Sequence, residues 1–419
     1  MSKHARDKRP YIKPVTRIEL SGENFTLRWI LIVLLLAVAV TALFVGITSM
    51  METEAGWKAI EVSSDEVNCS QDFQFYYDLG ADGDSATVEN KLLTTLYSQA
   101  TEDAHMIFSA YDQKDGVNNV RYLNEHVNEI VTVDETLYNA LELIVRYDNR
   151  HIFMAPVNVE YNRVFTASSD SEAAAYDPAR NPDVMAYVEE IVSYAGDPEM
   201  ISLEILGDNQ VQLNVAEEYL AFAEEEEIVT FLDFSWMTNA FIIDYIAEVL
   251  AEGGYTRGYL VSYDGFTRNL DARGETFHQN VFDYLDGTIY VPAALSYNKP
   301  ISMVFLRSYP VADEDQWHYY RYEDGSVASL LLDPADGVNK TAAHDLISYS
   351  YEAEGCGEML MQLIPVFIAD KFDAEALSAL TSNGIYSVWS EDRELLYNDS
   401  ELVLELTEEN SAYSIVLAE

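Results

Sequence analysis

The sequence lacks the motifs of several large enzyme classes. It has no GxGxxG after a predicted strand, no P-loop, no CxxC, no HExxH and no GxSxG. These absences argue against a dinucleotide site, a P-loop NTPase, a CxxC redox or metal site, a zinc protease and an α/β-hydrolase. The seven histidines, at positions 4, 105, 126, 151, 278, 318 and 344, form no ligand-spaced pair, so we expect surface or structural roles for them.

Cysteine and basic residues are also scarce. The only cysteines are Cys69 and Cys356, too few for a disulfide scaffold, although one bridge between them is compatible with the sequence. Against 24 Lys and Arg there are 72 Asp and Glu, which gives a formal net charge of −48. Such a surface repels phosphate backbones and argues against nucleic acid as a partner. We interpret this charge as the solvated coat of a secreted or halotolerant domain.

One long apolar run, from Trp29 to Met51, carries no charge. At about 1.5 Å per residue, a helix of this length crosses a hydrocarbon core of roughly 30 Å. Basic side chains outnumber acidic ones in residues 1–28, and a flank of this kind stays on the cytoplasmic side. The sequence therefore predicts a cytoplasmic basic arm (1–28), a transmembrane helix (29–51) in the cell membrane, and an extracytoplasmic remainder. A cleaved signal peptide is the alternative, but the run is longer than a typical h-region and residues 47–51 are a poor cleavage site.

After the predicted span, residues 52–70 have the composition of an acidic stalk, and residues 71–419 are predicted to form one undivided domain. Hydrophobic periodicity predicts helices at 85–104, 135–147, 182–195, 216–227 and 236–251. Strands are predicted at 71–79, 105–111, 201–206, 210–215, 228–234 and 259–263, and an exposed loop at 168–182. The strand–helix–strand passage from 228 to 263 favours a mixed α/β fold of sheets flanked by helices.

Three segments, in order, resemble the FAD:protein FMN transferase family, the ApbE-type flavin transferases. Its members lie outside the bacterial membrane and attach FMN to Thr or Ser of target proteins. Residues 107–135 resemble the family's Phe-Ser-x-Tyr-Asp strand and the valine-rich stretch after it. Residues 231–262 resemble its Asp-Leu-Gly-Gly-Ile-Ala-Lys-Gly helix entry, and residues 324–367 its His-Ile-x-Asp-Pro-x-Thr-Gly loop and following helix. The resemblance spans residues 71–398 and implies a flavin-transferase-like α/β fold.

Several positions depart from the family pattern. Ser235 and Trp236 stand where the family has Gly-Gly, and a Trp there occupies space that a flavin or its pyrophosphate needs. Asn239 stands in place of its Lys. Leu330 stands at the position of the catalytic His and cannot move a proton. The phosphate-contacting Ala-Thr-Ser stretch would fall near residues 305–307, where it is not retained. We therefore assign no catalytic residue.

Few cofactor or metal positions remain under this resemblance. The family's metal-binding Asp and Thr, four residues apart on a helix, align with Glu358 and Gln362. Their oxygens could hold a hard cation, but both side chains are longer than the family's, and Mg²⁺ requires tight octahedral distances. A solvent-facing or structural polar pair is the alternative. The positions at which cofactor contacts would remain are Asp233, Asp264, Gly265 and Asp333.

These departures predict a membrane-anchored extracytoplasmic protein that resembles a flavin transferase but is degenerate and non-catalytic. We expect it to act as a binding or assembly module without a cofactor. Its expected partners are the membrane, through residues 29–51, and a protein at the cell surface. Two alternatives stay open: an active transferase that uses FAD and Mg²⁺, and an acidic surface protein unrelated to the family.

Overall fold

The computed structural model describes residues 34, 53–64, 67–311, 315, 317–351, 355–407 and 412–418. The chain divides into two units, Met1–Glu54 and Ala55–Glu419. The predicted basic arm and membrane span, apart from Leu34, lie outside the described residues. Within the described part of the chain, no helix is long and apolar enough to cross a membrane. The following description concerns the second unit.

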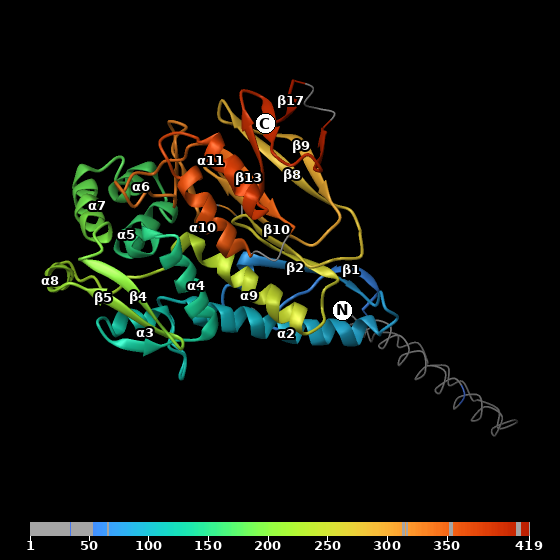
Figure 1. Cartoon of the computed structure of the whole chain (residues 1–419), viewed down its shortest axis with the longest axis horizontal. Coiled ribbons are helices and arrows are strands. Elements are labelled where there is room, and N and C mark those ends of the chain that lie inside the picture. The colour runs from blue at the N-terminus through green and yellow to red at the C-terminus, as the bar shows by residue number, and fades with distance from the viewer. Residues whose placement is uncertain are drawn as a thin grey trace, which may run out of the picture. The chain divides into compact units, whose positions relative to one another are not determined.

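A nine-stranded sheet runs through this unit, in the order β1-β2-β6-β7-β10-β13-β14-β15-β17 (Figure 1). Neighbouring strands are antiparallel except β15 and β17, which are parallel. The central strands β10 and β13 are buried at every position, as strands covered on both faces must be. The strands are β1 (Gly56–Ala59), β2 (Phe73–Leu79), β6 (Gly258–Ser262), β7 (Phe266–Asn269), β10 (Ile301–Arg307), β13 (Asp345–Ser350), β14 (Tyr386–Glu391), β15 (Glu394–Tyr397) and β17 (Ser414–Leu417).

The two faces of this sheet carry different layers. In β10, Val304 and Leu306 belong to the core cluster that includes three long helices, whereas Met303 and Phe305 belong to a cluster shared with β8 and β9. Since successive side chains of a strand point to opposite faces, helices cover one face and a sheet of order β16-β9-β8 covers the other. These elements are α2 (Ala86–Phe108), α9 (Thr238–Glu252), α10 (Cys356–Phe367), β8 (Phe277–Leu285), β9 (Thr288–Tyr297) and β16 (Val403–Leu406).

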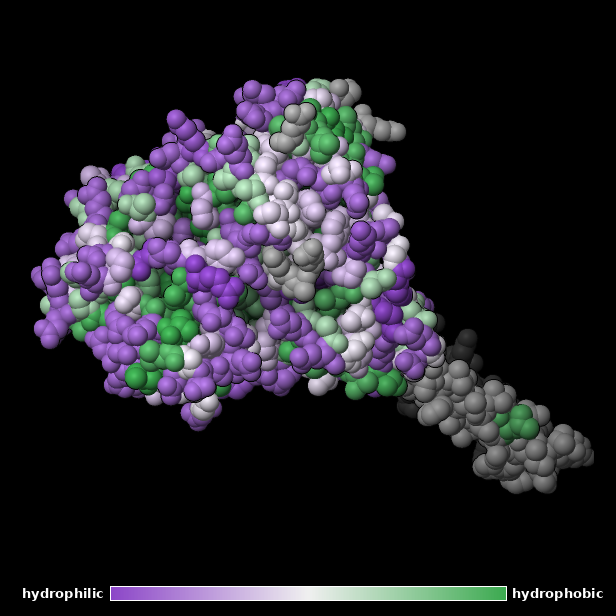
Figure 2. Space-filling view, viewed as in Figure 1, coloured by the Kyte–Doolittle hydropathy of each residue, from purple (hydrophilic) through white to green (hydrophobic). Residues whose placement is uncertain are grey.

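Residues 120–225 add a mainly helical region beside α2, α9 and α10, with a small sheet of order β3-β5-β4 (Figure 1). Several of its helices begin at residues that accept a hydrogen bond from the first turn, such as Asp134 before α4 and Asn181 before α7. The elements are α3 (Val120–Glu125), β3 (Ile130–Thr132), α4 (Glu135–Arg146), η2 (Arg150–Met154), α5 (Ala155–Phe165), α6 (Asp170–Tyr176), α7 (Pro182–Ala195), β4 (Ile201–Gly207), β5 (Gln210–Val215) and α8 (Glu217–Glu225). Hydrophilic side chains cover much of the visible face of the molecule, in keeping with the acidic composition (Figure 2).

Helices α9 and α10 are joined closely by one carboxylate. Asp244 of α9 accepts hydrogen bonds from the backbone N–H groups of Cys356 (2.9 Å) and Gly357 (2.8 Å) at the start of α10. It also pairs with Arg268 of β7. A Cβ atom at Gly357 would lie 2.8 Å from the ring of Phe241, so glycine permits the helices to approach. This contact fixes α9, whose first turn borders the site described below.

The mixed α/β expectation is confirmed, as are the helices predicted at 135–147 and 236–251 and the hairpin at 201–215. Three local predictions are wrong. The predicted strand 105–111 is the end of α2, the predicted loop 168–182 contains α6, and residues 228–234 form no strand. The predicted stalk is also corrected, because residues 56–59 form β1 at the edge of the sheet and residues 70–72 form the short helix η1 (Ser70–Asp72).

Candidate functional site

A cleft of about 560 Å³ lies where the end of α2, the start of α9 and the turn between β6 and β7 meet. Its titratable lining consists mainly of carboxylates and two histidines: Asp72, His105, Asp233, Asp264 and His318. Its aromatic lining residues are Phe108, Tyr111, Phe165, Trp236 and Trp317. No Lys or Arg is found among the described residues that line it. The cleft is therefore acidic and aromatic.

Asp233 is held at the wall of this cleft by the irregular segment that leads into α9. Its Oδ2 accepts a hydrogen bond from Tyr111 Oη (3.1 Å) and its Oδ1 accepts one from Ser235 N (3.1 Å). Burial raises the pKa of Asp233, against these hydrogen bonds, which lower it. Asn124 keeps the segment out of a sheet, because its Oδ1 accepts from the N–H groups at 231 and 232 and its Nδ2 donates to the carbonyl at 232 (2.8 Å each). A side chain thus takes the place of a neighbouring strand.

Asp264 enters the cleft from the turn between β6 and β7. Asn239 Nδ2 donates to its Oδ2 at 2.9 Å, whereas its Oδ1 is buried without a hydrogen-bond partner among the described residues. Gly265, with φ of +111°, makes this turn, and a Cβ there would collide with the carbonyl oxygen of Phe305. Gly265 itself does not line the cleft. Its conformation places Asp264 at the wall.

Asp72 is the last residue of η1 and lines the same cleft as Asp264. Burial, together with the Asp264 carboxylate, raises the pKa of Asp72 to about 6, while His318 and His105 act in the opposite direction. His105 pairs with Asp112 at 2.8 Å. The site therefore gathers carboxylates that repel one another and two imidazoles, one of them already paired.

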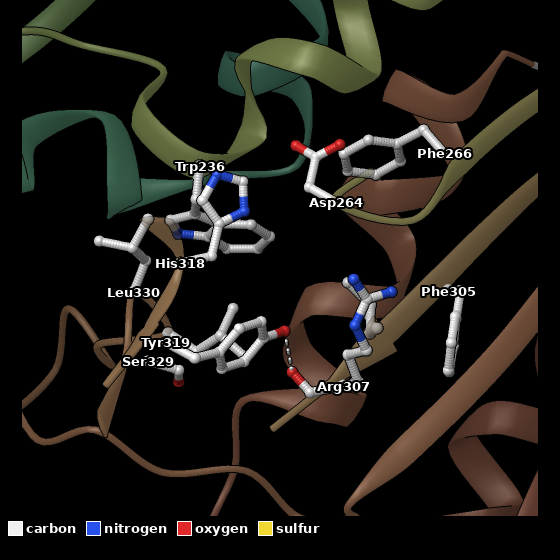
Figure 3. A pocket seen from close by; sticks show the side chains of 11 residues that line it. Trp236, Asp264, Phe266, Phe305, Arg307, His318, Tyr319, Ser329 and Leu330 are labelled. Atoms are coloured by element: carbon white, nitrogen blue, oxygen red, sulfur yellow. Dashed lines mark hydrogen bonds between the residues drawn. The ribbon is translucent and has the colours of Figure 1, made fainter. Parts of the chain in front are cut away.

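A chamber of about 40 Å³ adjoins the cleft and shares Trp236, Asp264, His318 and Leu330 with it. Figure 3 shows Trp236, His318 and Leu330 on one side of this chamber and Arg307 on the other. Arg307 is buried, pairs with Asp315 at 2.7 Å and donates to the carbonyl oxygen of residue 263. The positive charge of Arg307 is thus neutralised inside the protein.

Leu330 and Trp236 occupy the positions at which the resemblance placed the family's histidine and a glycine. Both line the cleft and the adjoining chamber, and Leu330 is buried. Leu330 supplies no acid or base to the cleft, and Trp236 adds a bulky ring to its wall.

The other positions named from the resemblance lie outside the cleft. Asp333 pairs with Lys340 at 2.8 Å and its Oδ1 accepts a hydrogen bond from Ala335 N, as befits a residue that shapes a turn. Glu358 and Gln362 line a separate, polar cavity of about 430 Å³. Glu358 lies 3.6 Å from Arg146, and Gln362 Oε1 accepts a hydrogen bond at 2.7 Å. The structure thus places Asp233 and Asp264 at one cleft, with Gly265 beside Asp264 in the turn, and places Asp333, Glu358 and Gln362 elsewhere.

These residues do not fit the metal that the family pattern implies. Gln362 has its oxygen engaged with Asn383, and Glu358 faces a cation on α4. Across the described residues, no group of three or more His, Cys, Asp or Glu is placed to hold a metal ion. Mg²⁺ prefers several oxygen ligands at short, regular distances. A preformed magnesium cage is therefore not part of this cavity.

Among the lining residues that the sequence does not single out are Asp72, Trp317 and His318. Asp72 precedes β2, and the other two precede β11 (Tyr319–Arg321), which pairs with β12 (Val327–Ser329). They reach the cleft only through tertiary packing. The aromatic density of residues 276–322 is a local signal near Trp317 and His318, but it predicts strands and not a site.

Comparison with known proteins identifies the fold. No model of a known protein family matches the sequence, and no curated protein sequence matches it. Among solved structures, the ApbE protein of Thermotoga maritima superposes with a TM-score of 0.53 at 11% identity, covering 86% of this chain and 99% of that one. The flavin transferase ApbE of Vibrio cholerae superposes with a TM-score of 0.51 at 11% identity, covering 86% and 100%. The chain therefore has an ApbE-like fold.

Proposed function

We propose that this chain is a membrane-anchored, extracytoplasmic ApbE-like protein whose cleft binds a ligand or partner without transferring FMN. The observation that carries the proposal is the acidic lining of the cleft, with three carboxylates and no Lys or Arg among its described residues. The pyrophosphate of FAD is itself anionic and needs cationic or backbone donors in its site. This lining would repel it.

The positions that carry the family's transfer chemistry hold other residues in this chain. Leu330 cannot act as a base, and loss of a general base typically lowers a rate by roughly 10²–10⁴-fold. Trp236 stands in place of a glycine that would let backbone N–H groups approach a phosphate. Glu358 and Gln362 line a different cavity from the cleft. Each difference opposes flavin transfer independently of the others.

One observation favours a second candidate function, an active FMN transferase. His318 lines both the cleft and its adjoining chamber, beside Leu330 (Figure 3). An imidazole there could remove a proton from an acceptor hydroxyl in place of the histidine that the family pattern has. This candidate requires FAD to bind despite the acidic lining.

A transfer assay separates the two candidates. Full-length protein is incubated with FAD, Mg²⁺ and a peptide that bears an acceptor Thr, and the peptide is examined by mass spectrometry, with the Vibrio cholerae flavin transferase ApbE as the positive control. We expect no FMN-modified peptide above the level without protein. Mg²⁺-dependent modification would overturn the proposal, and its loss in His318→Ala would establish the second candidate.

The anchor is proposed from the charge-free run that follows the basic arm. Cell fractionation should place the protein in the membrane, and protease added outside intact cells should remove all but the arm and the span. Recovery of a soluble, cleaved form from the medium would contradict the anchor and leave the assignment of the cleft unaffected.

A further inference from the structure

We propose that the cleft binds an organic cation, an ammonium or guanidinium group carried either by a small free amine or by a Lys or Arg side chain of a partner protein. This inference rests on the proposed function, because it names the ligand class of the same cleft. It is argued from the cavity, its carboxylates, its aromatic walls and the cation sites found elsewhere in the molecule.

The carboxylates of the cleft have acceptor capacity that the protein does not use. Asp264 Oδ1 is buried without a hydrogen-bond partner among the described residues, while its Oδ2 accepts from Asn239. Asp72 lines the same cleft, where burial first, and the charge of Asp264 second, raise its pKa. No described Lys or Arg faces them within the cleft. A cation placed between them would relieve this repulsion.

Aromatic rings line the cleft beside the carboxylates. Trp317 is 59% exposed and Tyr111 is 53% exposed, although both line the cavity. Trp236 and Phe108 line it more deeply. The face of an aromatic ring attracts ammonium and guanidinium groups, and tryptophan does so best. Large exposed rings around a cavity also point to a binding surface.

Elsewhere in the protein, carboxylates and a tryptophan ring surround one of its own arginines. Arg273 lies over the ring of Trp57, 5.9 Å from its centroid, and forms ion pairs at 2.7 Å with Asp78 and Asp271. Two carboxylates and a tryptophan ring there surround one guanidinium. At the cleft, three carboxylates and two tryptophans are present, yet no described Lys or Arg lies over either tryptophan ring. We infer that the missing cation comes from a ligand.

The small chamber does not reverse this charge balance. Arg307 lines the chamber but not the cleft. It forms an ion pair with Asp315 at 2.7 Å, which neutralises its charge. His318 and His105 are the remaining groups in the cleft that can become positive, and His105 is paired with Asp112. Near neutral pH the lining therefore keeps net negative charge, which suits a cation and opposes an anion.

The test is calorimetric titration of the full-length protein, held in detergent micelles, with three probes. These are acetyl-Gly-Arg-Gly-amide, the same peptide with citrulline in place of arginine, and spermidine. Citrulline keeps the shape of arginine but removes its charge. We expect saturable binding of the arginine peptide and at least tenfold weaker binding of the citrulline peptide, because hydrogen bonds between charged partners are the stronger ones. Comparable or tighter binding of spermidine would assign the site to a free amine, and its absence would assign it to a protein side chain.

Substitutions locate the binding in the cleft. Asp264→Asn and Asp72→Asn should each weaken the arginine peptide about tenfold or more, and Trp317→Ala by several-fold. Asp208→Asn, the same change at an exposed turn between β4 and β5, should leave it unchanged. Circular dichroism of each variant confirms that it is folded, and Trp317→Ala removes a ring that is already largely exposed.

Either of two results would overturn the inference: no binding of any cationic probe, or equal binding of the citrulline and arginine peptides. An unchanged affinity in both cleft aspartate variants would do so too. These outcomes leave the absence of FMN transfer standing, because the transfer assay decides that point separately. FMN transfer by a protein that also binds arginine peptides through Asp264 would refute the proposed function alone.

Discussion

A pair of buried carboxyl groups on the other side of the central sheet should make stability depend on pH. Asp345 at the start of β13 and Asp283 of β8 are both buried. Tyr309 Oη donates to Asp345 Oδ2 at 3.1 Å, while Tyr413 Oη and Ser390 Oγ donate to Asp283 at 2.6 and 2.8 Å. Burial first, and the Asp283 charge second, raise the pKa of Asp345 to about 8. The folded protein therefore holds a proton that the unfolded chain releases.

The sign of the effect follows from this difference. In the unfolded chain an Asp titrates near 3.9, so the folded state binds more protons between about pH 4 and pH 8. The stability that Asp345 contributes is complete below about pH 4 and is lost as pH rises towards 8. Each pKa unit corresponds to about 1.4 kcal/mol, and we expect a total loss of about 2–5 kcal/mol over this range.

The substitution Asp345→Asn removes this titration while keeping an acceptor for Tyr309. Urea unfolding of full-length protein in detergent, followed by tryptophan fluorescence between pH 5 and pH 8.5, measures the effect. The free energy of unfolding of the variant, relative to the original protein, should rise by about 2–4 kcal/mol across this interval. Asp208→Asn, an exposed change of the same kind, corrects for the loss of one negative charge. A constant difference between Asp345→Asn and the original protein at all pH values would refute the reasoning.

Three further outcomes follow from the geometry around the cleft. Gly265→Ala should lower the free energy of unfolding by about 2 kcal/mol or more, because φ is +111° and the new Cβ would collide with the Phe305 carbonyl oxygen. Thermal unfolding measures this loss, and an unchanged melting temperature would contradict it. Asn124→Ala should cost about 2–4 kcal/mol, because two N–H groups and one carbonyl lose their buried partner, and a loss below 0.5 kcal/mol in urea unfolding would argue against this clamp. Cys69 and Cys356 are both free, and burial raises the pKa of each thiol. Neither should therefore react quickly with a thiol reagent in the native protein, and rapid labelling of both would contradict this expectation.

Much of the architecture was readable from local patterns. The helix at 135–147 has apolar residues at helical spacing and an Asp134 cap, and the hairpin at 201–215 has turn residues between two apolar strands. Both depend on neighbours in sequence. Residues 228–234 have the composition of a strand, yet the N–H groups of residues 231 and 232 bond to Asn124, more than a hundred residues away in the chain. A pattern confined to one segment cannot reveal such a partner.

The candidate site was less predictable, for a related reason. The resemblance to the flavin transferases predicts Asp233 and Asp264 as cofactor positions, and both line the cleft. Glu358 and Gln362 were named from an aligned helix, but that helix presents them to another cavity. Asp72 had no distinguishing feature in its segment. Its pKa is raised only in the folded chain, first by burial and then by the charge of Asp264.

The central claim is that the cleft rejects FAD. The most direct measurement is equilibrium binding of FAD to the full-length protein, with and without Mg²⁺, followed by flavin fluorescence and calibrated with the Vibrio cholerae flavin transferase ApbE. The acidic lining, with three carboxylates and no described Lys or Arg, predicts no saturable binding at micromolar concentrations. Saturable, Mg²⁺-dependent binding of FAD that Asp264→Asn alters would contradict it.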